Sequence, residues 1–112
     1  MIRVQIEDFD LSAEVRALTA GRTDIGAIVT FTGTVRGSAG GKPIMSMTLE
    51  HYPGMTEAEL AAVEGEALAR WPLQASLIVH RVGLLQPTRR PASPLRNATE
   101  TVTHKCPPCT VR

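Results

Sequence analysis

The stretch Met55-Thr-Glu-Ala-Glu-Leu-Ala-Ala-Val-Glu-Gly-Glu-Ala-Leu-Ala-Arg-Trp71 decides the fold, together with Pro72 and the run Ala75-Ser-Leu-Ile-Val-His-Arg-Val82. Thr56 and Glu59 fit a capping box at the start of a helix that the proline ends. The helix carries an apolar stripe that we expect to pack on a sheet, and its members are Leu60, Val63, Ala67 and Trp71. The following apolar run predicts one strand of that sheet.

Upstream of this helix, the sequence predicts three strands and a second helix. Apolar and polar residues alternate over residues 2–6, which is the period of a half-buried strand. Asp10 can cap a helix over residues 11–20. The apolar, β-branched residues 25–35 predict a strand buried on both faces, and residues 44–52 predict another strand.

These elements follow one another as β-α-β-β-α-β. Strands and helices in this order are typical of the α+β class, and we expect both helices on one face of a mainly antiparallel sheet.

The composition changes near Leu84. Residues 1–83 hold all nine glycines and all four aromatic residues, with ten acidic and seven basic side chains. Residues 84–112 hold five of the eight prolines, both cysteines, and five basic residues against one acidic residue. We therefore expect a domain over residues 1–83 and an irregular, Pro/Arg-rich segment over residues 84–112.

Composition also argues against several classes of function. The net charge of +1 conceals about −3 in residues 1–83, so no nucleic-acid footprint is expected for that domain. No apolar run approaches the roughly 20 residues that span a bilayer, and the start of the chain lacks the apolar stretch of a signal peptide. We expect a cytoplasmic protein that contacts neither nucleic acid nor membrane and that holds no cofactor.

Cys106 and Cys109 have the spacing of a redox pair or of half a zinc site. A redox pair needs a preceding strand and a following helix, and a zinc site needs further ligands. Neither is present in the surrounding sequence, so no metal site is expected.

The glycine-rich loop Gly33-Thr-Val-Arg-Gly-Ser-Ala-Gly-Gly-Lys42 offers backbone N–H groups, hydroxyls and two cations, a set suited to an anion such as phosphate. The competing interpretation is a hairpin connection with surface charges. Glu50, His51 and His80 could serve in acid–base chemistry, but alternation sends the first two to opposite faces, and we favour structural roles for both histidines.

Four segments, in this order and spacing, resemble the large, catalytic subunit of molybdopterin synthase. They are Ile28-Val-Thr-Phe-Thr-Gly-Thr-Val-Arg36, Leu49-Glu-His-Tyr-Pro-Gly-Met-Thr-Glu57, Arg70-Trp-Pro-Leu73 and Ile78-Val-His-Arg-Val-Gly83. The resemblance covers residues 2–83. It implies an α/β-hammerhead-like domain of the α+β class.

The resemblance also implies a function. The family transfers sulfur from the C-terminal thiocarboxylate of a small ubiquitin-like subunit to cyclic pyranopterin monophosphate, which forms the dithiolene that later binds molybdenum. It works as a homodimer flanked by two small subunits. Thr34, Val35 and Arg36 match the family's substrate-binding position.

The sequence departs from the family after Gly83. The strand, helix and lysine-bearing segment expected there, whose lysines are catalytic in the family, are absent, and His104-Lys105 does not replace them. This break resembles translation in a shifted reading frame. We therefore expect an incomplete domain that is inactive alone, or alternatively a non-catalytic remnant that binds the small sulfur-carrier protein or itself.

Overall fold

The structure is a computed structural model that describes residues 1–87 and, as backbone, residues 98–103. Within these residues lie two helices, α1 (Leu11–Thr19) and α2 (Met55–Arg70). The strands are β1 (Ile2–Gln5), β2 (Val29–Gly33), β3 (Ser38–Ala39), β4 (Lys42–Pro43), β5 (Met47–Leu49), β6 (Ala75–Arg81), β7 (Gly83–Leu85) and β8 (Ala98–Thr103).

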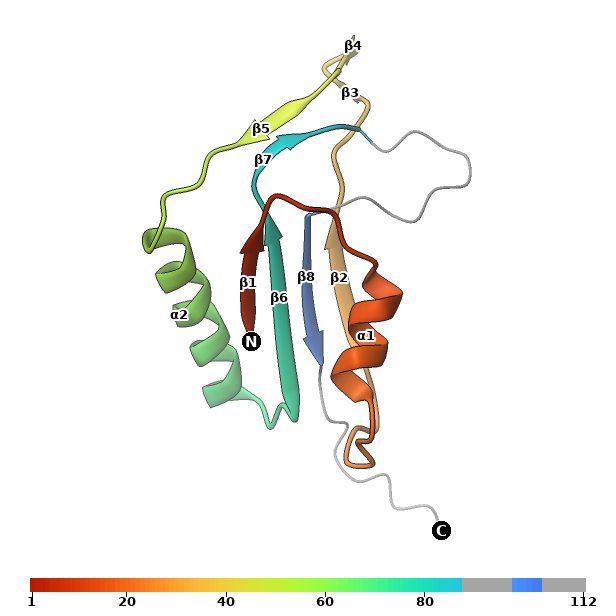
Figure 1. The fold of residues 1–112 in the computed structure, drawn as a ribbon, viewed down its shortest axis with the longest axis vertical. Coiled ribbons are helices and arrows are strands. Elements are labelled where there is room, and N and C mark those ends of the chain that lie inside the picture. The colour runs from red at the N-terminus through yellow and green to blue at the C-terminus, as the bar shows by residue number, and fades with distance from the viewer. Residues whose placement is uncertain (88–97, 104–112) are drawn as a thin grey trace.

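The main sheet has the strand order β1-β6-β8-β2 (Figure 1). β1 and β6 are parallel, whereas β8 is antiparallel to both β6 and β2. Two small ladders, β3–β4 and β5–β7, lie beyond one end of this sheet. Two helices with a mixed but mainly antiparallel set of strands confirm the α+β class.

β7 and β8 lie where the composition predicts an irregular segment. β8 is an interior strand, since Glu100 pairs in register with Ile78 of β6 and with Phe31 of β2. The five prolines argue against long elements but fall outside the run Ala98-Thr-Glu-Thr-Val-Thr103, which is rich in β-branched residues. The sheet therefore crosses the boundary predicted at residue 83, and averaging the composition over 29 residues hides this strand.

β2 is shorter and more exposed than predicted. Val29 is 56% exposed and Phe31 is 68% exposed, so the expectation of a strand buried on both faces is wrong. The physical reason is its position at the end of the sheet, where β8 is its one strand neighbour in the described part of the chain. Its apolar residues belong to an edge rather than to the centre of the core.

Both helices begin with side-chain contacts to the backbone. The Asp10 carboxylate accepts hydrogen bonds from the backbone N–H groups of Ser12 (2.7 Å) and Ala13 (3.1 Å), which confirms the predicted cap. α2 begins at Met55, and its cap differs from the prediction. The backbone N–H of Gly54 donates to Glu57 at 2.8 Å, so the glutamate that closes the cap lies two residues before Glu59.

The face of α2 that packs on the sheet differs from the predicted apolar stripe. Leu60 and Ala67 are half-buried, but Val63 is 57% exposed and Trp71 is 46% exposed. Glu64, which lies between Leu60 and Ala67 along the helix, is also half-buried and accepts a hydrogen bond from the Met1 ammonium. The contact face of α2 is therefore narrower and more polar than the sequence predicts.

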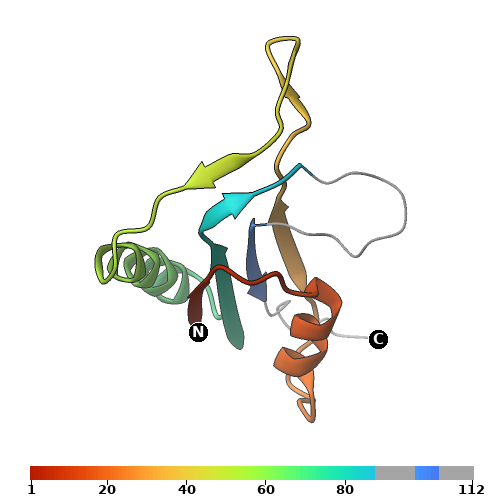
Figure 2. The same ribbon diagram turned by 45° about the horizontal axis from the view of Figure 1, so that its top comes forward.

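The two helices cover opposite faces of the sheet, not one face. Arg3 and Val4 are neighbours on β1, so their side chains point to opposite faces. Arg3 forms an ion pair with Glu14 of α1, whereas Val4 pairs in register with His80, which lies beside α2. The two helices therefore contact opposite faces of β1 and β6, and Figures 1 and 2 show α2 on the β1 side of the sheet and α1 on the β2 side.

The buried core centres on β6. Leu77, Ile78 and Val79 are between 1% and 3% exposed, and alternation places Ile78 on the face opposite the other two. Val35, Val82 and Leu85 complete the set of buried apolar side chains in the described residues. The sequence predicts a strand over this segment, which the structure confirms, and a continuous apolar run is typical of a strand buried on both faces.

We predict that Thr101→Pro in β8 destabilises the protein by about 3 kcal/mol or more, because proline removes a backbone donor and clashes within an interior strand. Urea unfolding followed by circular dichroism measures this change. Thr101→Ala keeps the backbone N–H and serves as the matched control. Equal unfolding midpoints for the two variants would show that residues 98–103 do not form part of the sheet.

Candidate functional site

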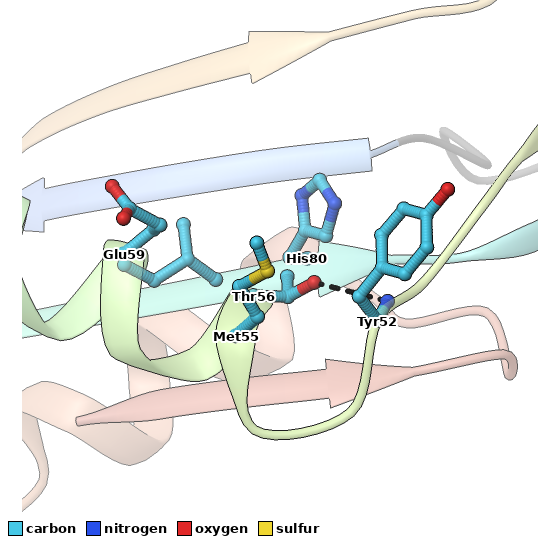
Figure 3. A pocket seen from close by; sticks show the side chains of 6 residues that line it. Tyr52, Met55, Thr56, Glu59 and His80 are labelled. Carbon is cyan, nitrogen blue, oxygen red and sulfur yellow. Dashed lines mark hydrogen bonds between the residues drawn. The ribbon is translucent and has the colours of Figure 1, made fainter.

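A pocket of about 310 Å³ lies between the start of α2 and the end of β6. Its lining residues are Tyr52, Met55, Thr56, Glu59, Leu60 and His80. Figure 3 shows Glu59 toward one end and Tyr52 toward the other, with Met55, Thr56 and His80 between them. The volume is at the lower end of the range for small-molecule sites.

The loop before α2 is held by hydrogen bonds along its length. The Tyr52 hydroxyl donates to Glu50 at 3.0 Å, and the Tyr52 backbone N–H donates to the Thr56 hydroxyl oxygen at 3.4 Å. The Tyr52 carbonyl in turn accepts from the backbone N–H groups of Met55 and Thr56, both at 3.1 Å. One wall of the pocket is therefore fixed to the first turn of the helix.

His51 is part of the same network. Its Nδ1 lies 3.2 Å from the Thr56 hydroxyl oxygen, and its Nε2 lies 3.5 Å from a carboxylate oxygen of Glu57. Glu50 bonds to Tyr52 instead. The expectation that Glu50 and His51 do not act as a pair is thus confirmed, and His51 has the structural role that the sequence favours.

The Glu57 carboxylate is stabilised in its charged form. Its own backbone N–H is the largest influence and lowers its pKa, and the Gly54 N–H and the nearby His51 ring lower it further, while partial desolvation acts in the opposite direction. A carboxylate at a helix N-terminus also interacts favourably with the helix dipole. Glu57 therefore supports the helix start rather than offering an acid–base group.

His80 differs from the structural role expected for it. It is half-buried on β6, and its imidazole makes no hydrogen bond or ion pair to any residue within 1–87. Its ring faces the pocket (Figure 3). The signal available in the sequence is a histidine near the end of a strand otherwise composed of buried apolar residues.

The glycine-rich loop forms a hairpin. β3 and β4 pair as Ser38↔Pro43 and Ala39↔Lys42. The turn between them needs positive φ at both central residues, which Gly40 (+55°) and Gly41 (+77°) supply. The hairpin interpretation is therefore confirmed as the backbone geometry of this loop.

The predicted substrate-binding residues lie just before this hairpin. Val35 is 7% exposed, so its side chain belongs to the core, while Thr34 and Arg36 are exposed. Within the residues that the structure describes, the Arg36 guanidinium has neither a hydrogen bond nor a carboxylate partner.

The pocket and the Arg36 segment are distinct but share one edge of the sheet. Val79 of β6 and Thr32 of β2 pair in register with the same residue, Thr99 of β8. The next residues, His80 and Gly33, therefore lie two strand spacings apart, about 10 Å. β2 and β6 run in the same direction, so Thr34, Val35 and Arg36 leave the sheet at the end where His80 lines the pocket.

Residues 1–87 contain no group of three or more histidine, cysteine, aspartate or glutamate side chains placed to hold a metal ion. Cys106 and Cys109 lie outside the described residues. Neither helix of the structure is long and apolar enough to cross a membrane.

Known proteins resemble this chain over most of its length. The profile of the MoaE protein family matches residues 4–91. Two relatives named molybdopterin synthase catalytic subunit match 86 residues, or 77% of this chain. The relative from Mesorhizobium japonicum is 48% identical and matched over 53% of its length, and that from Ralstonia nicotianae is 55% identical and matched over 49%.

A solved structure agrees with these relatives. The molybdopterin biosynthesis MoaE protein from Burkholderia ambifaria has a TM-score of 0.73 and 44% sequence identity, over 94% of this chain and 63% of that chain. This chain spans about half the length of the curated relatives that it matches. The family profile ends at residue 91, somewhat beyond the boundary predicted at residue 83.

We predict that Glu57→Gln lowers stability at neutral pH and that the difference from wild type shrinks in acid. Because folding lowers the pKa of Glu57 below its ordinary 4.5, the stabilisation is present above that pH and is lost as the pH falls through the lowered value. Urea midpoints between about pH 7 and pH 3 measure the effect. A difference that is constant over this range would mean that the charge of Glu57 does not stabilise the helix start.

Proposed function

The chain belongs to the MoaE protein family, and from this premise we propose that it acts as the corresponding part of a molybdopterin synthase catalytic subunit. The observation that carries the proposal is the 48–55% identity over 86 residues to catalytic subunits, on a shared fold. The reaction is sulfur transfer from a small-subunit thiocarboxylate to cyclic pyranopterin monophosphate. It belongs to molybdenum cofactor biosynthesis, and we place it in the cytoplasm.

This chemistry needs cationic groups near an anionic substrate. The pterin carries a phosphate, and negative charge develops on the acyl oxygen when water adds to the acyl carbon, before the carbon–sulfur bond breaks and leaves a carboxylate. We propose Arg36 as the phosphate ligand, since its guanidinium is exposed and has no carboxylate partner among the described residues. A guanidinium can bind phosphate through two parallel hydrogen bonds.

Thr34 and Val35 complete the proposed binding segment in different ways. The exposed Thr34 offers a hydroxyl that can donate to a phosphate oxygen. The buried Val35 side chain anchors the segment in the core, so Val35 can contact substrate through its backbone alone. A fixed residue beside Arg36 limits the backbone freedom that substrate binding would otherwise have to remove.

The proposed partners are those of the family. A small ubiquitin-like subunit supplies the thiocarboxylate, and two copies of the chain form a dimer within a heterotetramer. Exposed apolar side chains on β2 and on the β5–β7 ladder, such as Phe31, Met47 and Leu84, agree with a surface that associates with other chains.

Turnover by the 112-residue chain is not expected. Lys42 and Lys105 are its two lysines, and neither lies in a segment like the family's catalytic one. We propose that the break after residue 83 reflects a shifted reading frame, which the other two frames of the source DNA would test by encoding, or not encoding, a lysine-bearing segment. The alternative is a remnant that binds the small subunit without catalysis.

Reconstitution separates these possibilities. The chain is mixed with thiocarboxylated small subunit and cyclic pyranopterin monophosphate, and dithiolene product is measured beside calorimetric binding of the small subunit. In parallel, residues 4–91 replace the matching segment of the Ralstonia nicotianae subunit. We expect binding without turnover for the chain and turnover for the chimera. An inactive chimera that folds and binds the small subunit would contradict the proposed function.

In the active chimera, we predict that Arg36→Ala lowers kcat/KM about 30-fold or more, which corresponds to about 2 kcal/mol for a charge-assisted bond to phosphate. Lys42→Ala is the matched control, because it removes an exposed cation from the neighbouring hairpin. An equal loss in both variants would indicate a general charge effect, and no loss in Arg36→Ala would remove this residue from the binding site.

A further inference from the structure

Burial falls steeply across one face of the main sheet. Ile78 of β6 and Phe31 of β2 pair in register with the same residue, Glu100 of β8, so their side chains point to the same face. Ile78 is 3% exposed, whereas Phe31 is 68% exposed. Ser76 of β6 and Val29 of β2 form a second pair of this kind, at 9% and 56%. The β6 side of this face is therefore covered and the β2 side is open.

The position of α2 explains this difference. Glu64 of α2 binds the Met1 ammonium, and the first turn of α2 meets His80 of β6 in the pocket. His80 follows two residues after Ile78 and points to the same face, so α2 covers the half of this face that β1 and β6 form. The other described helix, α1, contacts the opposite face. Neither helix of the described residues therefore covers β8 and β2 on the α2 side.

The open half of this face has the width of one helix. Neighbouring strands lie about 4.8 Å apart, so the midline of β8 and β2 lies two spacings, about 10 Å, from the midline of β1 and β6. Helices that pack side by side have axes about 8–10 Å apart. A helix beside α2 would therefore cover Phe31 and Val29 without displacing α2.

The relatives of this chain carry more of the fold than the described residues do. The family resemblance predicts a strand, a helix and a lysine-bearing segment after Gly83, and β8 supplies a strand there. The MoaE protein structure from Burkholderia ambifaria matches 94% of this chain but only 63% of its own length. The helix and the lysine-bearing segment are the family elements that the described residues lack.

Charge favours the same partner. Residues 1–83 carry ten acidic and seven basic side chains, so their net charge is negative. A lysine-bearing polypeptide has the complementary sign, which speeds its approach and favours it over acidic partners.

We propose that the half of this face formed by β8 and β2 binds a separate polypeptide, made of the helix and the lysine-bearing segment of the family. The apolar side of that helix packs on Phe31 and Val29, next to α2. This inference rests on the proposed function, because it names the partner that supplies the lysines missing from the chain. Docking makes and breaks no covalent bond.

A fragment of the Ralstonia nicotianae subunit tests the docking. The fragment begins after the counterpart of Thr103 and is titrated into the 112-residue chain in a calorimeter. We expect a one-to-one complex whose helical circular dichroism exceeds the sum of the two parts. Its affinity should fall as salt is added, because the two parts carry opposite charge.

Two variants of β2 form a matched pair. Phe31 and Thr30 are both exposed, so aspartate at either position should leave the chain folded, which a thermal melt checks. Alternation places the two side chains on opposite faces of the sheet. Phe31→Asp should weaken fragment binding about tenfold or more, since it puts a charge where apolar surface is buried. Thr30→Asp should stay within about twofold of wild type.

The outcomes distinguish this proposal from the proposed function. Absence of a complex, or equal affinities for the two variants, would overturn the docking site even where the chimera is active. So would a loss of self-association in Phe31→Asp with unchanged fragment binding, which would assign the face to a second copy of the chain. If the fragment binds through Phe31 but neither the complex nor the chimera makes dithiolene product, the docking site stands and the proposed function fails.

Discussion

Strand β6 is covered on both faces and hydrogen-bonded along both edges. β1 pairs with one edge in parallel and β8 pairs with the other in antiparallel orientation. α1 and α2 approach from opposite faces, so Leu77, Ile78 and Val79 are almost completely removed from water. Because β1 precedes β6 by more than 70 residues and β8 follows it beyond residue 87, the sheet forms through contacts that are distant in sequence.

Strand β6 also holds one wall of the candidate site in place. His80 follows directly after Val79, which is 1% exposed, so the base of the pocket adjoins the buried core of the described residues. The opposite wall is fixed by the contacts that begin α2, in which Glu57, His51 and Thr56 bind one another and the preceding backbone. A site with both walls held in place needs little reorganisation on binding.

The sequence predicts a structural feature correctly where the interaction that forms it involves only residues close together in the chain. Asp10 caps α1 because its carboxylate reaches N–H groups two and three residues onward. The start of α2 was predicted two residues late, since Thr56 and Glu57 both offer side chains there and the glutamate closes the cap. Burial of β2 was overestimated because composition does not show whether a strand lies at the centre or at an edge.

The sequence by itself determined the family, the α+β class and the two helices. The tertiary structure decided that β8 joins β2 to β6, that the helices lie on opposite faces, and that His80 meets Tyr52 and Met55 in a pocket. Helix caps and periodicity are encoded within about four residues. Strand partners and pockets depend on segments far apart in the chain, whose pairing is settled by competition among all possible contacts.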